Sequence, residues 1–134
     1  MREGSIAGPM EGIQSMIIKH LPKIRKRVSE GHGETSLYQS FWQGEEKPDT
    51  MKSFSNFARI TVKPAGTNKI HVHQDLEQVY IILRGRGTLH VGDEKAQVKA
   101  GDAVFLPAKV SHGFFNTGDK TAVLLLVGTR ISPA

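Results

Sequence analysis

The part of the chain after residue 54 is a succession of short β-type runs separated by turn residues. The runs are rich in β-branched and aromatic residues, and they cover residues 57–62, 69–73, 78–83, 87–91, 96–99, 103–106, 111–116 and 121–128. Gly92 and Asp93 stand between two alternating runs, as a tight hairpin turn requires. This spacing predicts an all-β antiparallel sandwich or barrel, with no helix after residue 54.

The chain of 134 residues has the length of one domain with a single core. We expect residues 54–134 to form the barrel and residues 16–53 to add strands and loops that pack on it. Within that segment, residues 16–21 are predicted to be a short strand or a strand-like arm that Pro22 ends, and residues 37–42 are predicted to be a strand. Residues 1–15 carry glycines and no apolar period, so we expect a flexible arm.

Composition restricts the chemistry further. The chain has no cysteine, which excludes disulfides, thiolate nucleophiles and sulfur-ligated metal centres. It has no apolar run of membrane-spanning length and no secretory leader, so we expect a cytoplasmic protein with no membrane partner. The net charge of +5 owes much to a short basic stretch, which we interpret as a solvated face because no nucleic-acid module accompanies it: Lys19, Lys23, Arg25, Lys26 and Arg27.

Two histidine-bearing segments hold the candidate site. His71 and His73 are two residues apart on a predicted strand, so their side chains share one face. Gln78 and Tyr80 share a face of the next run, and His112 follows on a later one. Imidazole nitrogens and an amide or carboxylate oxygen from three strands could together bind one divalent metal ion.

These segments resemble the paired motifs of the cupin superfamily, which are conical jelly-roll β-barrels. The first motif is matched in spacing by Gly66, His71, His73, Gln78 and Gly85, and the second by Gly101, Pro107, His112 and Asn116. Gln78 stands where glutamate is usual, and Lys109 replaces a glycine. The resemblance covers residues 54–128 and implies a single-domain cupin with one divalent ion, either Zn, Ni, Fe or Mn, bound by His71, His73, Gln78 and His112.

Glu77 is the alternative to Gln78 as the fourth ligand, because a carboxylate is the better ligand by chemistry. Strand parity allows only one of the two side chains to face inward, and Glu77 would need a local bulge to do so. The spacing to Gly85 favours Gln78. A neutral glutamine would leave the ion its full +2 charge, making it a stronger Lewis acid.

Other residues receive weaker assignments. Tyr80 is predicted to line the barrel and is a candidate for moving a proton, and Arg59, on a run that we place inside the barrel, is a candidate for binding an anionic substrate. We expect His20, His32 and His90 to be surface or hydrogen-bonded structural residues.

Three functions remain open, because the cupin fold serves many activities. The ligand set implied by the resemblance is similar to that of pectin-degradation cupins, which linearise unsaturated uronates, and of some polyketide cyclases. This implies an enzyme that uses its ion as a Lewis acid to isomerise, enolise or ring-open a small oxygen-rich or carbonyl substrate, such as a sugar derivative. The alternatives are an iron- or manganese-dependent dioxygenase and a non-catalytic module that binds or senses a small molecule. In each case we expect a homodimer formed through the outer sheet.

Overall fold

The computed structural model describes residues 16, 18–43 and 53–131, and within these it is built almost wholly of strands. A short 3-10 turn, η1 (Leu21–Lys23), comes first. The strands are β1 (Arg27–Val28), β2 (Ser36–Gln43), β3 (Phe54–Val62), β4 (Thr67–His71), β5 (Leu76–Arg84), β6 (Arg86–Val91), β7 (Glu94–Lys99), β8 (Ala103–Leu106), β9 (His112–Phe115) and β10 (Ala122–Arg130).

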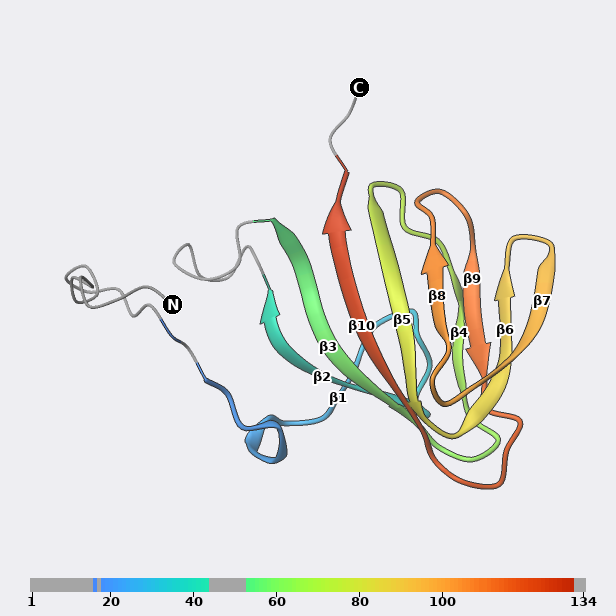
Figure 1. Ribbon diagram of the computed structural model, residues 1–134, viewed down its shortest axis with the longest axis horizontal. Coiled ribbons are helices and arrows are strands. Elements are labelled where there is room, and N and C mark those ends of the chain that lie inside the picture. The colour runs from blue at the N-terminus through green and yellow to red at the C-terminus, as the bar shows by residue number, and fades with distance from the viewer. Residues whose placement is uncertain (1–15, 17, 44–52, 132–134) are drawn as a thin grey trace.

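The strands form two antiparallel sheets (Figure 1). One sheet has six strands in the order β1-β2-β3-β10-β5-β8, and the other has four in the order β4-β9-β6-β7. The described strands therefore form two separate sheets rather than a closed barrel. This arrangement agrees with the predicted all-β jelly-roll class. No helix among the described residues is long and apolar enough to cross a membrane.

One hydrophobic core joins the sheets. Burial alternates along β5, where Gln78, Tyr80 and Ile82 are buried and the residues between them are more exposed. The core draws on both sheets, because Phe114 and Leu89 of the four-stranded sheet belong to the same cluster as buried side chains of the other, including Ile60, Val62, Tyr80, Ile82, Leu106 and Leu124. Burial of these alternate positions fixes the register of each strand, since a slip of one residue would expose them.

The predicted strands after residue 54 are all present, with ends shifted by no more than a few residues. The hairpin at Gly92 is confirmed, because Val91 pairs with Glu94 and Gly92 has a φ of 59°. The strand predicted at residues 37–42 lies within β2. Of the two alternatives for residues 16–21, a short strand or a strand-like arm, the strand is absent at the described positions, since residues 16 and 18–20 are not in a strand and η1 begins at Leu21. The predicted arm at residues 1–15 lies outside the described residues.

Strand pairing and side-chain hydrogen bonds join the N-terminal segment to the six-stranded sheet. β2 pairs with β3, and β1 pairs in turn with β2 at the edge of the six-stranded sheet. The buried Gln39 of β2 donates from its Nε2 to the carbonyls of Leu21, at 3.2 Å, and Ile24, at 2.8 Å. Its Oε1 accepts from Nε of Arg59 at 3.2 Å. These bonds hold the residues before β1 against the sheet.

Asn116, the last residue matched in the second motif, has a structural role. Its Nδ2 donates to the carbonyls of Val62, Lys63 and Lys120 at 3.1, 3.1 and 2.8 Å. Its Oδ1 accepts from the N–H of Gly118 at 2.9 Å. A buried amide thus joins the end of β9 to the end of β3 and to the turn before β10.

Lys109 stands in a left-handed backbone conformation, with a φ of 70°. Its N–H donates to the carbonyl of His73 at 2.7 Å, so this turn holds one of the candidate ligands. A side chain in this conformation costs about 1–2 kcal/mol relative to glycine. The φ value explains why glycine is the residue expected at this point of the second motif.

Replacing Lys109 with glycine should therefore stabilise the protein. We expect Lys109→Gly to raise the free energy of unfolding in urea by about 0.5–1 kcal/mol, since relief of the left-handed strain exceeds the added entropy of the unfolded chain. Lys95→Gly, at an exposed position of β7, is the matched control and should lower it by about 0.5–1 kcal/mol. A less stable Lys109→Gly variant would contradict this account.

Candidate metal centre

Two paired strands and the turn after one of them bring the three predicted histidines together. His71, at the end of β4, is the register partner of His112, at the start of β9. Side chains of directly paired residues lie on the same face of a sheet, and the two rings have centroids 4.3 Å apart. His73 follows two residues after β4 ends, and its ring centroid lies 4.9 Å from that of His71 and 5.6 Å from that of His112.

A β-bulge in β4 shapes this corner of the site. The register between β4 and β9 shifts between Asn68 and His71, so both side chains face inward although they are three residues apart. The bulged backbone passes close to β9 at Gly113. A Cβ on Gly113 would lie 2.7 Å from Cγ1 of Ile70 and 2.9 Å from its Cα, so only glycine allows this approach.

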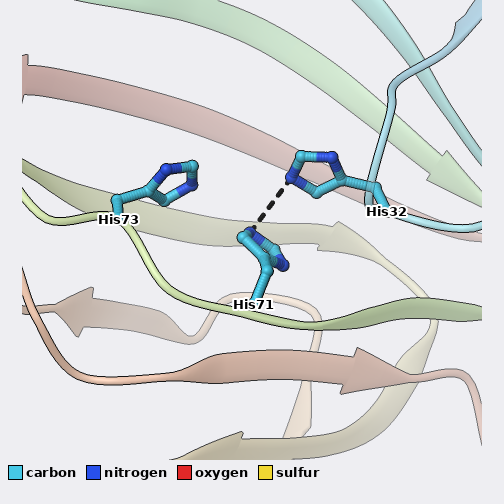
Figure 2. A group of neighbouring side chains, drawn as sticks. All are labelled: His32, His71 and His73. Atoms are coloured by element: carbon cyan, nitrogen blue, oxygen red, sulfur yellow. Dashed lines mark hydrogen bonds between the residues drawn. The ribbon is translucent and has the colours of Figure 1, made fainter.

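A fourth histidine, His32, lies in the cluster. It comes from the turn between β1 and β2, and its Nε2 is 3.1 Å from Nε2 of His71 (Figure 2). Ligand nitrogens of His32, His71 and His73 all lie within 4.8 Å of one another. We expected His32 to be a surface or hydrogen-bonded structural residue; it is hydrogen-bonded, and the structure also brings it to His71 and His73. No metal motif surrounds it, and its proximity arises only from tertiary packing, so the sequence pattern could not reveal it.

His32, His71 and His73 line a cavity of about 420 Å³, whereas His112 is buried behind it and is not part of its lining. Its wall also includes Gln78 and the two tyrosines Tyr38 and Tyr80. Two exposed arginines from the N-terminal segment, Arg25 and Arg27, complete the charged part of the lining, and no aspartate or glutamate is among the described residues that line it. The permanently charged side chains that the described residues place at this cavity are thus positive.

Gln78 and Glu77 occupy opposite faces of β5. Gln78 is 4% exposed and lines the cavity, whereas Glu77 does not. The pairing of β5 with β8 continues without a register shift from Gln78 to Ile81, so no bulge turns Glu77 inward. The structure places Gln78, not Glu77, beside the histidines.

A glycine makes room for the Gln78 side chain. Gly128 of β10 pairs with Gln78 on one side and with Asn56 of β3 on the other. A Cβ at Gly128 would collide with Oδ1 of Asn56 and would lie 3.1 Å from Cγ of Gln78. Both Asn56 and Gln78 line the cavity, so the missing side chain leaves space for two amides at its floor.

Tyr80 is buried at 1% exposure, and its ring meets that of His112 edge to face at 5.9 Å. The Nδ2 of Asn68 donates to the hydroxyl of Tyr80 at 3.1 Å and to that of Tyr38 at 2.9 Å. Burial raises the pKa of both phenols above the ordinary value. Both tyrosines are therefore protonated at neutral pH and can serve as hydrogen-bond donors.

Arg59 lies on the other side of the sheet. It alternates along β3 with the buried Ala58 and Ile60, is absent from the residues that line the cavity, and bonds to Gln39. We expected Arg59 to lie on an inner strand and to reach an anionic substrate. Its side chain instead lies away from the histidines. Arg25 and Arg27 lie at the cavity in its place.

Each histidine of the cluster favours its neutral form. Burial, followed by the charge of His71, lowers the pKa of His112 to about 3 and that of His32 to about 4. Burial also lowers the pKa of His71 and His73. Neutral imidazole is the form that binds metal ions, so these histidines are in the metal-binding protonation state near neutral pH.

The arrangement of nitrogens fits a metal ion. Nδ1 of His71 faces the carbonyl of Lys69 at 2.6 Å, and Nδ1 of His32 faces that of Glu30 at 3.0 Å. A carbonyl can only accept, so each Nδ1 carries the proton and each Nε2 presents a lone pair. Two nitrogens that lie about 2.0–2.1 Å from one ion are separated by about 2.9–3.4 Å, and the observed separation is 3.1 Å.

Unpaired buried atoms support the same conclusion. Nε2 of His112 and Oε1 of Gln78 are buried and have no hydrogen-bond partner among the described residues. Buried polar atoms without partners are costly, and a divalent ion would satisfy them. The donor set of imidazoles and an amide suits Zn, Ni, Fe or Cu.

The geometry and the sequence together define the family. The sequence model of the cupin domain family matches residues 58–128 of this protein, which are more than half of the chain. The protein belongs to the cupin family. The match includes His71, His73, Gln78 and His112 but not the segment that carries His32.

Individual relatives agree with this assignment. An oxalate-binding protein of Thermotoga maritima is 34% identical over 71 residues, which are 53% of this chain and 59% of that protein. The match thus spans less than two thirds of that relative. A predicted oxalate decarboxylase from the same organism superposes with a TM-score of 0.76 at 24% identity, over 86% of this chain and 100% of that one. The polyketide cyclase RemF of Streptomyces resistomycificus superposes with a TM-score of 0.71 at 22% identity, over 89% of this chain and 87% of that one.

The lowered histidine pKa values predict that acid destabilises the metal-free protein. Between about pH 3 and pH 6.5 the unfolded chain binds more protons than the folded one, because its histidines titrate near 6.5. The stabilising contribution of these neutral histidines is therefore fully present above pH 6.5 and is lost as the pH falls toward 4. We expect the midpoint of thermal unfolding, measured in a chelator, to be lower at pH 5 than at pH 7.5.

His112→Asn should reduce this pH dependence, because it removes the group with the lowest histidine pKa. His20→Ala, which changes an exposed histidine outside the cluster, should leave the dependence unchanged. A wild-type midpoint that stayed constant between pH 7.5 and pH 5 would show that the histidines are not held neutral by burial.

Proposed function

We propose that the protein is an enzyme whose divalent metal ion, held by His71, His73, His112 and Gln78, serves as a Lewis acid toward a small, anionic, oxygen-rich substrate. The reaction class is a rearrangement, in which a carbonyl or hydroxyl substrate such as a sugar acid is isomerised, enolised or ring-opened. The observation that carries this proposal is the charge of the cavity: its ligands are neutral, and its charged side chains are Arg25 and Arg27.

The charge argument concerns both metal and substrate. Three imidazoles and an amide leave a divalent ion its full charge, which strengthens its polarisation of a substrate oxygen. The arginines add further positive potential at the same cavity, and no carboxylate of the described lining opposes it. Such a site attracts an anion, and guanidinium groups bind carboxylates in a bidentate manner.

The oxalate-binding relative supports a ligand of this class. Its name identifies a small dicarboxylate, and it shares 34% identity with this chain over 71 residues. A cavity of about 420 Å³ accommodates a molecule of that size or a somewhat larger sugar acid.

The tyrosines are placed to donate hydrogen bonds to the substrate. Tyr38 lines the cavity beside His32, with ring centroids 5.1 Å apart, and connects through Asn68 to the buried Tyr80. Because both phenols have a raised pKa, they would stabilise negative charge that develops on a substrate oxygen rather than remove a proton. Tyr80, our candidate for moving a proton, would then serve as a donor.

Removal of one ligand tests the metal-dependent function. We expect protein purified without added metal to contain one equivalent of Zn, Ni, Fe or Mn by mass spectrometry. His73→Ala should lower the metal content, and with it both calorimetric binding of oxalate and turnover of 2-oxo acids and uronates. His90→Ala, on β6 of the same sheet and beside Phe115, changes a histidine that does not line the cavity; it is the matched control and should keep all three. Wild-type protein that neither retained nor rebound a divalent ion would refute the proposal.

The same preparations separate the alternatives. A dioxygenase would consume oxygen, lose this activity on chelation and regain it only with iron or manganese. A non-catalytic sensor, which the name of the oxalate-binding relative favours, would bind oxalate saturably without turnover. Turnover under nitrogen with a redox-inactive ion would favour the Lewis-acid enzyme over both.

We also propose that the protein forms a homodimer through the outer face of the six-stranded sheet. Phe54 and Phe105 are 48% and 57% exposed, and together with Val79 and Val127 they line a shallow apolar depression across four neighbouring strands. An apolar face of this kind is typical of surfaces that pair with a second copy.

A charge placed on this face should prevent dimerisation. We expect light scattering with gel filtration to give a dimer mass for the wild type and a monomer mass for Phe105→Lys. Ile70→Lys, at a position that is 52% exposed on the other sheet, should remain dimeric. A wild-type monomer at tens of micromolar would contradict the dimer.

A further inference from the structure

We infer that His32 is a further ligand of the metal ion, supplied by the N-terminal segment, and that the site is a four-histidine centre. The inference rests on the proposed metal-dependent function and adds a residue that lies outside the part of the chain matched by the cupin model. It assigns a direct role to a turn that the family pattern does not include.

The contact between His32 and His71 favours a bound cation. Their Nε2 atoms are 3.1 Å apart, and each Nδ1 is used as a donor to a backbone carbonyl. In two neutral rings both Nε2 atoms then present lone pairs to each other, which is repulsive. A direct hydrogen bond would need a positively charged ring among four histidines, or an Nδ1 without its proton facing a carbonyl. A bound metal ion resolves the conflict and satisfies both nitrogens.

The carbonyl contacts also orient the rings. Histidines that bind metal ions usually donate their other ring N–H to a carbonyl or carboxylate, which fixes the tautomer and directs the free nitrogen at the ion. His32 and His71 have the same arrangement, each toward the carbonyl of the residue two positions earlier. His32 is therefore prepared as a ligand in the same way as a residue of the established motif.

The backbone holds His32 against the strand that carries His71. The carbonyl of His32 accepts from the N–H of Lys69 at 3.0 Å, and its own N–H donates to the carbonyl of Ser29 at 3.1 Å. Gly31 and Gly33 flank it with φ values of 83° and 90°, which a glycine adopts without strain. A Cβ at Gly33 would lie 3.3 Å from the Lys69 side chain, so the turn is packed closely on β4.

Two consequences follow for the site. A fourth imidazole shifts the donor set further toward nitrogen, which favours Zn, Ni, Cu or Fe over Mn or Mg. A bond from the ion to His32 would also hold the turn after β1 against the strands that carry His71 and His112. Arg25 and Arg27, which precede that turn, would then be held at the cavity by the metal itself.

Cobalt binding to the full chain tests this inference. We expect His32→Ala to weaken Co²⁺ binding by at least about tenfold, since loss of groups around metal ligands already costs 10–100-fold. The visible Co²⁺ spectrum should change, and added imidazole should restore it by filling the vacated position. His20→Ala removes an exposed histidine of the same N-terminal segment and should bind Co²⁺ as the wild type does.

The wild-type protein provides a second measurement that does not depend on the stability of a variant. In a long-range ¹H–¹⁵N spectrum, the Nε2 signal of His32 should shift on addition of Zn²⁺ together with that of His71. A His32 signal that did not move, or a His32→Ala variant with an unchanged Co²⁺ affinity and spectrum, would overturn the inference. If His73→Ala still lost its metal, the proposed function would stand; a wild type that bound no Co²⁺ would overturn both.

Discussion

The pairing of β4 with β9 is the constraint on which the site depends. It places His71 directly opposite His112, and the bulge between Asn68 and His71 turns both of those β4 side chains inward. A regular strand would direct residues 68 and 71 to opposite faces, so either the tyrosine contacts of Asn68 or the inward position of His71 would be lost. Gly113 permits the bulge because the backbone of Ile70 occupies the space of a Cβ. A glycine beside one candidate ligand, His112, thus fixes the position of another, His71.

Much of the fold could be predicted because burial repeats every two residues. The alternation of Gln78, Tyr80 and Ile82 with their more exposed neighbours assigned the inner face of β5 from the sequence. The same alternation along β3 buries Ala58 and Ile60 and directs Arg59 outward, so a place on an inner strand does not bring this side chain to the cavity. Where a strand has one buried face, period alone carries this information.

The N-terminal segment could not be predicted in this way. Its placement depends on the bonds of Gln39 to the carbonyls of Leu21 and Ile24 and on the bond between Lys69 and His32, which join residues distant in sequence. None of these three bonds leaves a pattern in the local sequence. The sequence pattern therefore did not indicate the part of the candidate site that this segment supplies, with Arg25, Arg27 and His32, whereas it did indicate the residues on the later strands.

The glycine of β10 lies between Asn56 and Gln78, two amides that line the cavity. A single methyl group there would collide with the Asn56 amide and crowd the Gln78 amide. Gly128 itself does not line the cavity, so a substitution at position 128 would change the cavity only through these two amides. Because Gln78 is the residue proposed as the fourth metal ligand, the shape of the cavity and the donor set of the candidate metal site are linked at this one glycine.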